Sequence, residues 1–480
     1  MNINIIIYSI MMLEHEECYH IDDFEYDDDN NNNDNDNNEY AGFLHVSRTY
    51  GKSGKRFLYK VVPYNRELPQ LLIPYDLKVE FSKNSKNKYI LFIYDNLSGC
   101  SQKTHSTGKL IRTLGDADNL DAYYQYMLYG RNVKPILTKI NKHMRTLNLN
   151  ESVFNPIFNK YIQNNEDIVT IDNNNSEYFD DALGFNNNKL SIYISNVCVW
   201  LEEFNLWDYM SDEVKTIYLP RQRELMLPKN LTELCSLKEN KKSIVLRITV
   251  NNEQKFEITF ETITVRKNFY FEENELISDC LYQDLFNFTK QFTHITSSDE
   301  LVSYWMIFAN TKIGEFLSQN GKGIFKKNIQ KYNDEELEKM LREHEFSKDY
   351  YLLSGNYCQI TSPIRRKADI INILFLMKQF GFIFNNGELY SNKWLSQLDK
   401  WNNNMKQIRR IENEAMLVDK IVSFNNRELT YYGKKIGDYI KINSLNKLIK
   451  YDYHEENNEI KLIIKIIECD ERKRVLLEIV

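Results

Sequence analysis

Short apolar runs separated by turn residues follow one another between residue 41 and about residue 93. This spacing is typical of β-strands, and it predicts strands at residues 42–46, 55–62, 71–74 and 88–93. Basic and aromatic residues alternate around the second run, and the candidates for ligand contact there are Lys55, Arg56 and Tyr59. A small barrel of this kind offers aromatic faces to bases and positive charge to phosphates of a single-stranded nucleic acid. A plain β-barrel whose charges form a solvated surface is the alternative.

Helical spacing replaces the strand pattern further along the chain. It predicts helices at residues 120–131 and 133–144, followed by a large segment, residues 150–417, with strands at 243–250 and 255–265 before long helices. The last of these helices, residues 394–417, combines apolar positions at helical spacing with opposite charges four residues apart. The pattern then returns to strands, at residues 439–442, 460–467 and 474–479. A chain of 480 residues with this order of elements is predicted to be an α+β protein of several domains.

Charge is distributed unevenly along the chain. Residues 1–47 contain twelve acidic residues and no Lys or Arg, and residues 22–40 are of low complexity. Residues 1–40 are therefore predicted to be a flexible acidic N-terminal segment. The whole chain has a net charge of −7, whereas the rest of it carries 61 basic and 56 acidic residues, a balance of +5. A mildly basic body is compatible with RNA binding in local channels.

The stretch from Tyr357 to Asp369 carries the most specific pattern in the chain. Pro363 presets its own φ and disfavours the helical region for Ser362, so a turn is predicted here. Arg365 and Arg366 then open an apolar helix. Two guanidinium groups at a helix N-terminus suit the binding of a phosphodiester. An ordinary capped core helix with an arginine-rich first turn is the alternative.

Three carboxylates upstream lie among apolar and small residues rather than in a solvated run of charges. Residues 167–171 predict a buried strand, so Asp172 falls at a strand end, and ordered structure resumes after a short loop at Asp180 and Asp181. Carboxylates grouped in this way hold hard cations such as Mg²⁺, which prefer oxygen ligands, and Mn²⁺ is a second candidate. An Asn-rich surface loop with incidental aspartates is the alternative.

Both segments resemble the RNB family, the ribonuclease II-like exoribonucleases. Residues 361–369 are similar to its Thr-Ser-Pro-Ile-Arg-Arg-Tyr-x-Asp segment, and residues 171–183 are similar to its block of four aspartates. Further matches follow in the order of the family, at Thr216–Pro220, Met226–Pro228, Leu234–Leu237 and Met306–Asn310. The Asn-, Lys-, Ile- and Tyr-rich composition is typical of an AT-rich genome and similar to that of RNB-like proteins of large DNA viruses.

The resemblance implies an α+β multidomain fold in which an RNB catalytic-type domain is flanked by OB-type β-barrels. It divides the chain into the acidic segment at 1–40, an OB or cold-shock-like domain at 41–135, an RNB domain at 150–417 and a degenerate OB-type domain at 421–480. The implied activity is a Mg²⁺-dependent 3′→5′ exoribonuclease that acts as a monomer and degrades single-stranded RNA to nucleoside 5′-monophosphates.

The resemblance also assigns roles to individual residues. Asp172 and Asp181 are expected to hold the metal, and Asp180 is the carboxylate on which the hydrolytic step most depends. The two arginines, Arg365 and Arg366, are expected to bind the scissile phosphate. Tyr218 matches the tyrosine that packs on the terminal nucleotide, although it could equally be a core aromatic.

Several positions depart from the family pattern. Tyr178 stands where the second aspartate is expected, Asn196 replaces another aspartate, and Ile373 and Leu374 occupy the places of a His-Arg pair. Glu177 lies one residue from the missing carboxylate, but a one-residue slip reverses the side-chain direction in an extended segment. An RNA-binding pseudo-nuclease of the same fold is therefore the alternative to a nuclease.

Cysteine usage and hydropathy bear on the location of the protein. The seven cysteines are scattered without a Cys-x-x-Cys pair, which predicts reduced thiols in an intracellular protein that is not secreted. The opening residues 1–13 are apolar but short and lack basic residues, so neither a signal peptide nor association with a membrane is expected. A packed N-terminal strand is the alternative interpretation of this segment.

Overall fold

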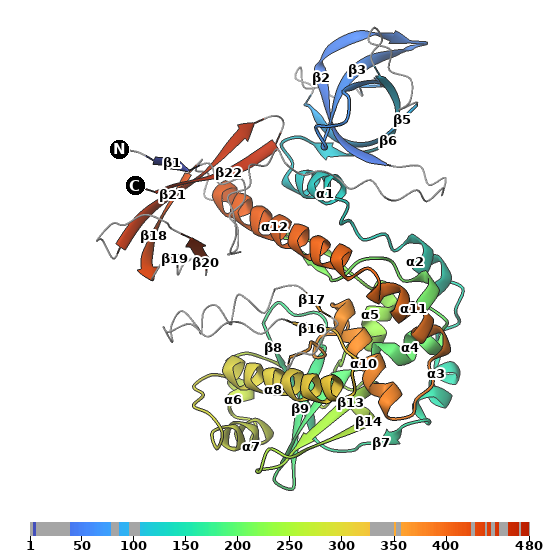
Figure 1. Ribbon diagram of the computed structural model, residues 1–480, viewed down its shortest axis with the longest axis vertical. Helices are drawn as coiled ribbons and strands as arrows, with labels where there is room; N and C mark the ends of the chain where they lie inside the picture. Colours follow the sequence, from blue (N-terminus) through green and yellow to red (C-terminus); the bar gives the residue numbers. More distant parts are fainter. Residues whose placement is uncertain are drawn as a thin grey trace. The chain divides into compact units, whose positions relative to one another are not determined.

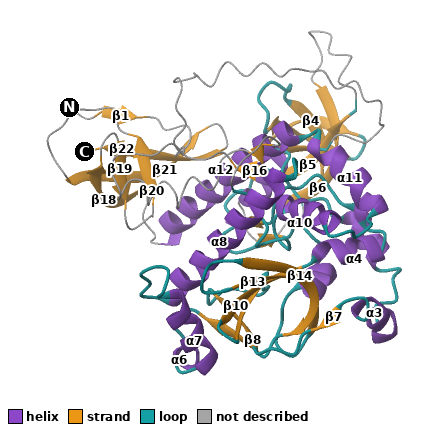
Figure 2. Cartoon of the chain, turned by 60° about the horizontal axis from the view of Figure 1, so that its bottom comes forward, coloured by secondary structure: helices purple, strands orange, loops and turns teal. Residues whose placement is uncertain are grey.

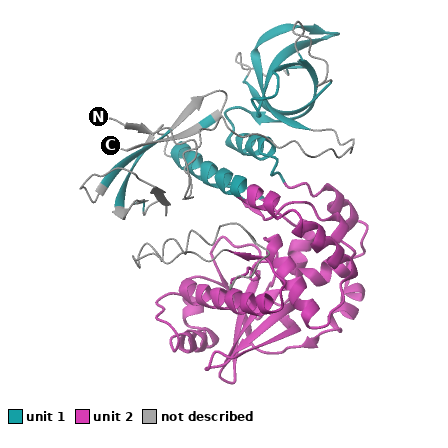
Figure 3. Ribbon diagram, viewed as in Figure 1, with its two compact units in different colours: residues 1–134, 218–223, 406–480 teal, residues 135–217, 224–405 magenta. Residues whose placement is uncertain are grey.

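The chain divides into two compact units (Figure 3). In the computed structural model, unit 1 contains residues 1–134, 218–223 and 406–480, and unit 2 contains residues 135–217 and 224–405. The residues that the structure describes are 3–5, 39–77, 86–95, 106–326, 350–351, 357–423, 428–436, 439–442, 447–450, 459–469 and 472–479. The acidic segment predicted at residues 1–40 lies outside these residues except at 3–5, 39 and 40.

Unit 1 contains a closed five-stranded barrel with the order β2-β3-β4-β6-β5 (Figure 1). Its strands are β2 (Tyr40–Ser53), β3 (Arg56–Pro63), β4 (Leu71–Tyr75), β5 (Lys88–Tyr94) and β6 (Ser106–Asp116). Leu44, Val61, Ile90 and Phe92 fill the interior, as their alternation along the strands requires. The backbone at Gly42 approaches this interior so closely that a Cβ there would lie 2.7 Å from Phe92 and Val61. The four predicted strands are confirmed, and the barrel agrees with the OB-type fold expected for this region.

A tyrosine-rich helix packs beside the barrel. Asn119 caps the N-terminus of helix α1 (Leu120–Gly130). Its side chain accepts hydrogen bonds from the backbone amides of Asp121 and Ala122. Tyr126 stacks on Tyr89 of β5, with ring centroids 4.5 Å apart. The helix predicted at residues 120–131 is therefore confirmed, and buried aromatic contacts hold it to the barrel.

The C-terminal residues of unit 1 form a six-stranded antiparallel sheet together with β1 from the N-terminus. Its order is β1-β22-β21-β18-β19-β20, and among the strands described it runs open from β1 to β20. The strands are β1 (Ile3–Ile5), β18 (Glu428–Ile436), β19 (Tyr439–Ile442), β20 (Lys447–Lys450), β21 (Glu459–Cys469) and β22 (Arg472–Ile479). The strands predicted in this region are confirmed. Pairing of β1 with β22 supports the interpretation of the opening residues as a packed strand.

Unit 2 is built on a seven-stranded sheet with the order β15-β8-β9-β10-β13-β14-β7. Its strands are β7 (Ile162–Gln163), β8 (Ile168–Asp172), β9 (Asp181–Asn186), β10 (Lys189–Ser195), β13 (Lys242–Val250), β14 (Phe256–Thr264) and β15 (Lys267–Tyr270). The central strands pair antiparallel, and β7 and β15 pair parallel at the edges. Ile168 lies opposite Gly184 in the pair formed by β8 and β9. This register places Asp172 and Asp181 at the same end of the two strands.

Helices α4, α8 and α10 lie on one side of this sheet (Figure 2). The helices of unit 2 are α2 (Thr138–Met144), α3 (Glu151–Phe158), α4 (Val197–Glu203), α5 (Lys229–Cys235), α6 (Asn274–Ile277), α7 (Cys280–Thr289), α8 (Ser298–Gln319), α10 (Lys367–Gln379) and α11 (Asn385–Leu395), with a 3₁₀ turn η1 at Trp207–Tyr209. Helix α12 (Leu398–Ser423) belongs to both units. The remaining short strands pair as β11 (Ile217–Tyr218) with β12 (Arg223–Glu224), and β16 (Phe325–Lys326) with β17 (Tyr350–Tyr351).

Two predicted helices differ from those observed. The helix predicted at 133–144 begins only at Thr138. Pro135 disfavours the helical conformation at Lys134, which argues against a helix that begins at residue 133. The helix predicted at 394–417 is two helices, α11 and α12, with a break at Ser396 and Gln397. The Ser396 hydroxyl donates a hydrogen bond to the carbonyl of Lys393, and such bonds compete with continued helix. None of the helices described has the length and hydrophobicity needed to span a lipid bilayer.

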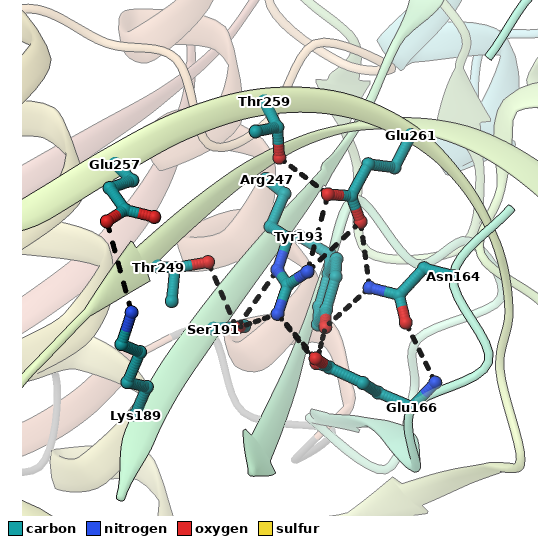
Figure 4. Close-up of polar contacts among 10 residues, drawn as sticks. All are labelled: Asn164, Glu166, Lys189, Ser191, Tyr193, Arg247, Thr249, Glu257, Thr259 and Glu261. Atoms are coloured by element: carbon teal, nitrogen blue, oxygen red, sulfur yellow. Dashed lines mark hydrogen bonds and ion pairs between the residues drawn. The ribbon is translucent and has the colours of Figure 1, made fainter. Parts of the chain in front are cut away.

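A network of polar side chains fixes the register of the sheet at the end away from Asp172 (Figure 4). The guanidinium of Arg247 on β13 donates to both carboxylate oxygens of Glu166 at 2.7 Å and to those of Glu261 on β14 at 3.3 Å. Its Nε also donates to the hydroxyl of Ser191 on β10 at 3.1 Å. Because one cation bridges three strands and the loop before β8, a slip of any strand would leave these charges unpaired.

Candidate functional site

The carboxylate of Asp180 joins the two segments singled out in the sequence. Its Oδ1 accepts a hydrogen bond from the backbone amide of Ile364 at 2.8 Å, and its Oδ2 lies 3.2 Å from Nε of Arg365. The side chain of Asp180 is buried, whereas that of Arg365 is 48% exposed. The fold therefore brings the aspartate block and the arginine turn together, with an accessible guanidinium beside a buried carboxylate.

The predicted turn is confirmed, the helix begins directly after the two arginines that were expected to open it, and Asp369 organises this segment. The backbone amides of Arg365 and Arg366 both donate to the carbonyl of Ser362, which closes the turn. Asp369 is buried and accepts from the Ser362 amide at 2.7 Å and from the Arg366 guanidinium at 2.8 Å. Arg366 has an extended backbone, and helix α10 begins at the next residue. Arg366 is thus held by its own helix, and Arg365 is the more exposed of the two arginines.

Two buried asparagines hold the segment that precedes the turn. Asn310 on α8 accepts from the Ile360 amide at 2.9 Å and donates to the Tyr357 hydroxyl at 3.0 Å. Asn372 on α10 donates to the carbonyl of Gln359 at 2.9 Å. The match at Met306–Asn310 was the sequence signal for the first anchor, whereas the anchoring role of Asn372 had no signal of its own.

Burial and mutual repulsion raise the pKa values of the three aspartates. Burial raises the pKa of Asp180 to about 6, against the opposing charge of Arg365. Burial also raises the pKa values of Asp172 and Asp181, and repulsion from the other carboxylates adds to both shifts. The Oδ2 atom of Asp172 is buried and accepts no hydrogen bond from any residue that the structure describes. A bound cation would relieve the repulsion among these buried carboxylates, so the group favours cation binding.

The aspartates of this site suit a metal ion that binds both protein and substrate. They suit less well a metal ion that is held by protein side chains alone. Within the described ranges, no group of three or more His, Cys, Asp and Glu side chains is arranged to hold a metal ion. Mg²⁺, however, usually keeps several waters and takes only one or two carboxylates together with substrate phosphates. Asp172 and Asp181, at the same end of β8 and β9, supply such a pair.

The place of the missing aspartate is occupied by an aromatic ring beside a lysine. Nζ of Lys238 lies 5.7 Å from the ring centroid of Tyr178, and Glu177 is exposed on the same loop. The next residue is fixed, because the Phe179 amide donates to Ser236 at 2.9 Å and its carbonyl accepts from the Leu237 amide at 2.9 Å. A shift of the loop that would bring Glu177 into the place of Tyr178 would break these bonds.

The other departures from the family pattern lie in the core. Ile373 and Leu374 are fully buried on α10. Asn196 is also fully buried, and its Nδ2 donates to the sulfur of Met377 on the same helix at 3.2 Å. All three neutral side chains are therefore in the core, and Asn196 contacts α10 directly.

The predicted nucleic-acid contacts of unit 1 are only partly accessible. Tyr59 was expected to offer a stacking face, but it is 4% exposed and packs among the core residues of the barrel, because the alternation of β3 turns it inward. Arg56 is exposed and pairs with Asp76 at 2.9 Å. Lys55 lies in the turn between β2 and β3. Tyr218 is exposed in unit 1, and its backbone amide donates to Glu412 at 3.0 Å.

Two aromatics on the same hairpin are accessible instead. Tyr50 is 40% exposed with the guanidinium of Arg48 5.5 Å from its ring centroid, and Phe57 is 44% exposed with Nζ of Lys52 at 4.5 Å. Phe57 has the same strand parity as Tyr59 but lies at the end of the hairpin, beyond the core, so its ring is accessible.

We expect Phe57 and Tyr59 to respond differently to substitution. Phe57→Ala should leave the fold stable and weaken single-stranded RNA binding by about 1–3 kcal/mol, as expected for one lost base-stacking contact. Tyr59→Ala should instead lower the free energy of unfolding by about 3–5 kcal/mol through a cavity in the barrel core. Filter binding and chemical denaturation measure the two effects, and an unaltered affinity in Phe57→Ala would contradict a stacking role.

Comparison with known proteins gives the same fold. Residues 162–280 match the family model of the RNB domain. No curated protein sequence matches the chain. Mycoplasma genitalium RNase R in complex with double-stranded RNA is similar in structure, with a TM-score of 0.65 and 16% identity over 91% of this chain and 95% of that chain. Its apo form aligns with a TM-score of 0.65 and 15% identity over 91% of this chain and 89% of that chain. Yeast Ssd1, a pseudonuclease, aligns with a TM-score of 0.52 and 13% identity over 89% of this chain and 67% of that chain. At these identities the likeness shows the fold.

Proposed function

We propose that this chain, which carries an RNB domain, is a divergent metal-dependent exoribonuclease that degrades single-stranded RNA from its 3′ end to nucleoside 5′-monophosphates. The observation that carries the proposal is the contact of Asp180 with Ile364 and Arg365, which unites the aspartate block and the arginine turn in one site. The similarity of the fold to that of Mycoplasma genitalium RNase R, whose structure was solved in complex with double-stranded RNA, supports the choice of RNA as the ligand. The proposal includes that the protein acts as a monomer. It also includes a reducing intracellular location, which suits the free, buried thiols of Cys198, Cys235 and Cys358.

The side chains of the site divide the work of hydrolysis. Arg365, exposed in the turn before α10, would bind the scissile phosphate and stabilise the charge that develops on it. Arg366, held by Asp369, would add positive charge from a fixed position. Asp180, with a pKa of about 6, is ionised at neutral pH and can accept a proton from the attacking water. Asp172 and Asp181 would hold a Mg²⁺ or Mn²⁺ ion, which when bound supplies a water of lowered pKa and neutralises phosphate charge.

The raised pKa values predict that the metal-free protein loses stability as the pH rises. A carboxyl group whose pKa is higher in the folded than in the unfolded state stabilises the fold when it is protonated, and this contribution disappears as the pH rises through the folded pKa. The free energy of unfolding in EDTA should therefore fall as the pH rises from about 4, the pKa of an unfolded aspartate, through the folded pKa values, which are about 6 for Asp180 and also raised for Asp172 and Asp181. The full loss is about 1.4 kcal/mol for each unit of pKa shift. Mg²⁺ should reverse the loss. Thermal unfolding at pH 5.5 and 8, with Asp181→Asn as control, measures this, and equal melting temperatures of wild type and variant at both pH values would contradict it.

Direction and product are tested with end-labelled RNA. With Mg²⁺ or Mn²⁺, a 3′ label should leave as a mononucleotide at the earliest times, while a 5′ label should remain on RNA that shortens stepwise. Release of the 5′ label first, or internal cleavage, would contradict the proposed direction. Products that lack a 5′ phosphate would contradict the proposed chemistry.

A second candidate function is RNA binding without hydrolysis. The pairing of Tyr178 with Lys238 favours it, because a ring and a cation stand where a fourth carboxylate is expected. The similarity of the fold to yeast Ssd1, a pseudonuclease, is compatible with it. This function predicts tight binding of single-stranded RNA that weakens steeply with salt, with no turnover across a wide titration of Mg²⁺ and Mn²⁺.

A further inference from the structure

A fully buried lysine opens the helix that carries the arginine turn. Lys367 is the first residue of α10, at the position where the pattern quoted above for the RNB family has tyrosine. Its Nζ lies 4.0 Å from the ring centroid of Trp394 and 5.5 Å from that of Trp401, and it donates a hydrogen bond to the carbonyl of Ser211. Two cation–π contacts and a hydrogen bond thus hold the ammonium group in place, in contrast to the ammonium group of a solvated surface lysine.

Backbone contacts join residues 211–216 to the arginine turn and the start of α10. The Lys367 amide donates to the carbonyl of Val214 at 2.9 Å, and the Thr216 amide donates to the carbonyl of Arg365 at 3.0 Å. Lys215 and Arg366 face each other as an isolated antiparallel bridge. Residues 211–216 therefore form a support along one side of the arginine turn, and the Lys367 side chain closes it at one end.

Burial disfavours the ammonium form of Lys367, and two nearby acids favour it. Asp212 and Glu213 lie on the supporting segment, and Oε2 of Glu213 is buried without a hydrogen-bond partner among the described residues. Lys393 and Lys400 oppose them, although Lys400 is itself paired with Asp212 at 2.9 Å. Burial lowers the pKa of Lys367 to about 7, while the indole faces and the two acids stabilise the charge.

We infer that Lys367 is a positioning residue, which fixes the supporting segment 211–216 against the turn and thereby sets the direction of Arg365 and Arg366 toward the phosphate. The catalytic part of this inference rests on the proposed function. An error of about 1 Å in the placement of a reacting group can cost about 100-fold in rate, so a side chain that only supports the turn can still have a large effect. The fold depends less on the Lys367 side chain than the direction of the arginines does. The backbone hydrogen bonds between residues 214–216 and 365–367 remain when that side chain is replaced.

The test compares Lys367→Met with Lys393→Met. The first variant keeps the length of the side chain and removes its charge, and the second removes a charge from the exposed face of α11. We expect Lys367→Met to lower kcat about 10–100-fold with little change in KM, and to speed amide hydrogen exchange at residues 362–367 about 10-fold. Lys393→Met should change neither. Lys367→Arg, which keeps the cation, should recover part of the rate.

Each outcome decides the inference. Wild-type kcat and exchange rates in Lys367→Met would overturn it, and so would faster exchange with an unchanged kcat. If the wild type itself hydrolyses no RNA, the proposed function fails separately, and the inference then depends on exchange and on RNA affinity. In that case faster exchange with weaker RNA binding than in Lys393→Met supports positioning, and unchanged values overturn it. If Lys367→Met does not fold, Lys367→Arg and Lys367→Tyr provide the same comparison.

Discussion

Replacing Asp180 by asparagine should reduce RNA hydrolysis about 10²–10³-fold, which is the usual cost of removing one essential electrostatic group from an active site. Asparagine keeps an oxygen that can accept from the Ile364 amide, so the turn should stay in place. It loses the negative charge that pairs with Arg365, so RNA affinity should stay within about twofold or increase. Single-turnover rates and filter binding separate the two effects.

Glu177→Gln is the matched control for Asp180→Asn. It removes one carboxylate by the same chemical change on the same loop, but Glu177 is exposed, whereas Asp180 is buried against Ile364 and Arg365. Its rate should equal that of the wild type. Equal rates in wild type and Asp180→Asn, or equal losses in both variants, would contradict the assignment of Asp180.

Replacing Tyr178 by aspartate should raise both metal affinity and turnover about 10-fold to 100-fold. The substitution restores the carboxylate that the RNB pattern has at this position and adds negative charge to the loop between Asp172 and Asp181. Lys238, 5.7 Å from the Tyr178 ring, would attract the new carboxylate and reduce the gain. The double variant with Lys238→Met should therefore exceed the single one. A Mn²⁺ titration of the hydrolysis rate measures both parameters.

Tyr178→Asn distinguishes a charge effect from a loss of bulk. It removes the ring and adds no charge, so it should show no gain. A gain of the same size in Tyr178→Asn would mean that the ring blocks the site, and that the missing carboxylate is not the defect. No gain in Tyr178→Asp or in its double variant with Lys238→Met would contradict the view that the missing carboxylate limits metal affinity and turnover.

Much of the fold could be predicted from periodicity alone. The barrel strands, the strand that ends at Asp172 and helix α10 follow from short-range alternation and helical spacing, which depend only on neighbouring residues. The meeting of Asp180 with the arginine turn could be anticipated only because both segments resembled the same family. Their contact spans 184 positions in the sequence, and no local pattern encodes it.

The remaining features depend on long-range packing. Tyr59 could not be assigned to the inside of the barrel without the register of β3 against its neighbours. The anchoring role of Asn372 and the indole pair around Lys367 join residues from different helices and loops, so the sequence alone did not bring them together. The return of residues 218–223 to unit 1 likewise has no signal in composition or periodicity.

The most direct test is a mass-spectrometric measurement of the products formed from single-stranded RNA across a titration of Mn²⁺. The central claim is that the site around Asp180 and Arg365 hydrolyses RNA with metal bound by Asp172 and Asp181. It predicts that the wild type releases nucleoside 5′-monophosphates in a metal-dependent manner and that Asp180→Asn does not. Identical product profiles for the two proteins, whether both are active or both inert at every metal concentration, would contradict it.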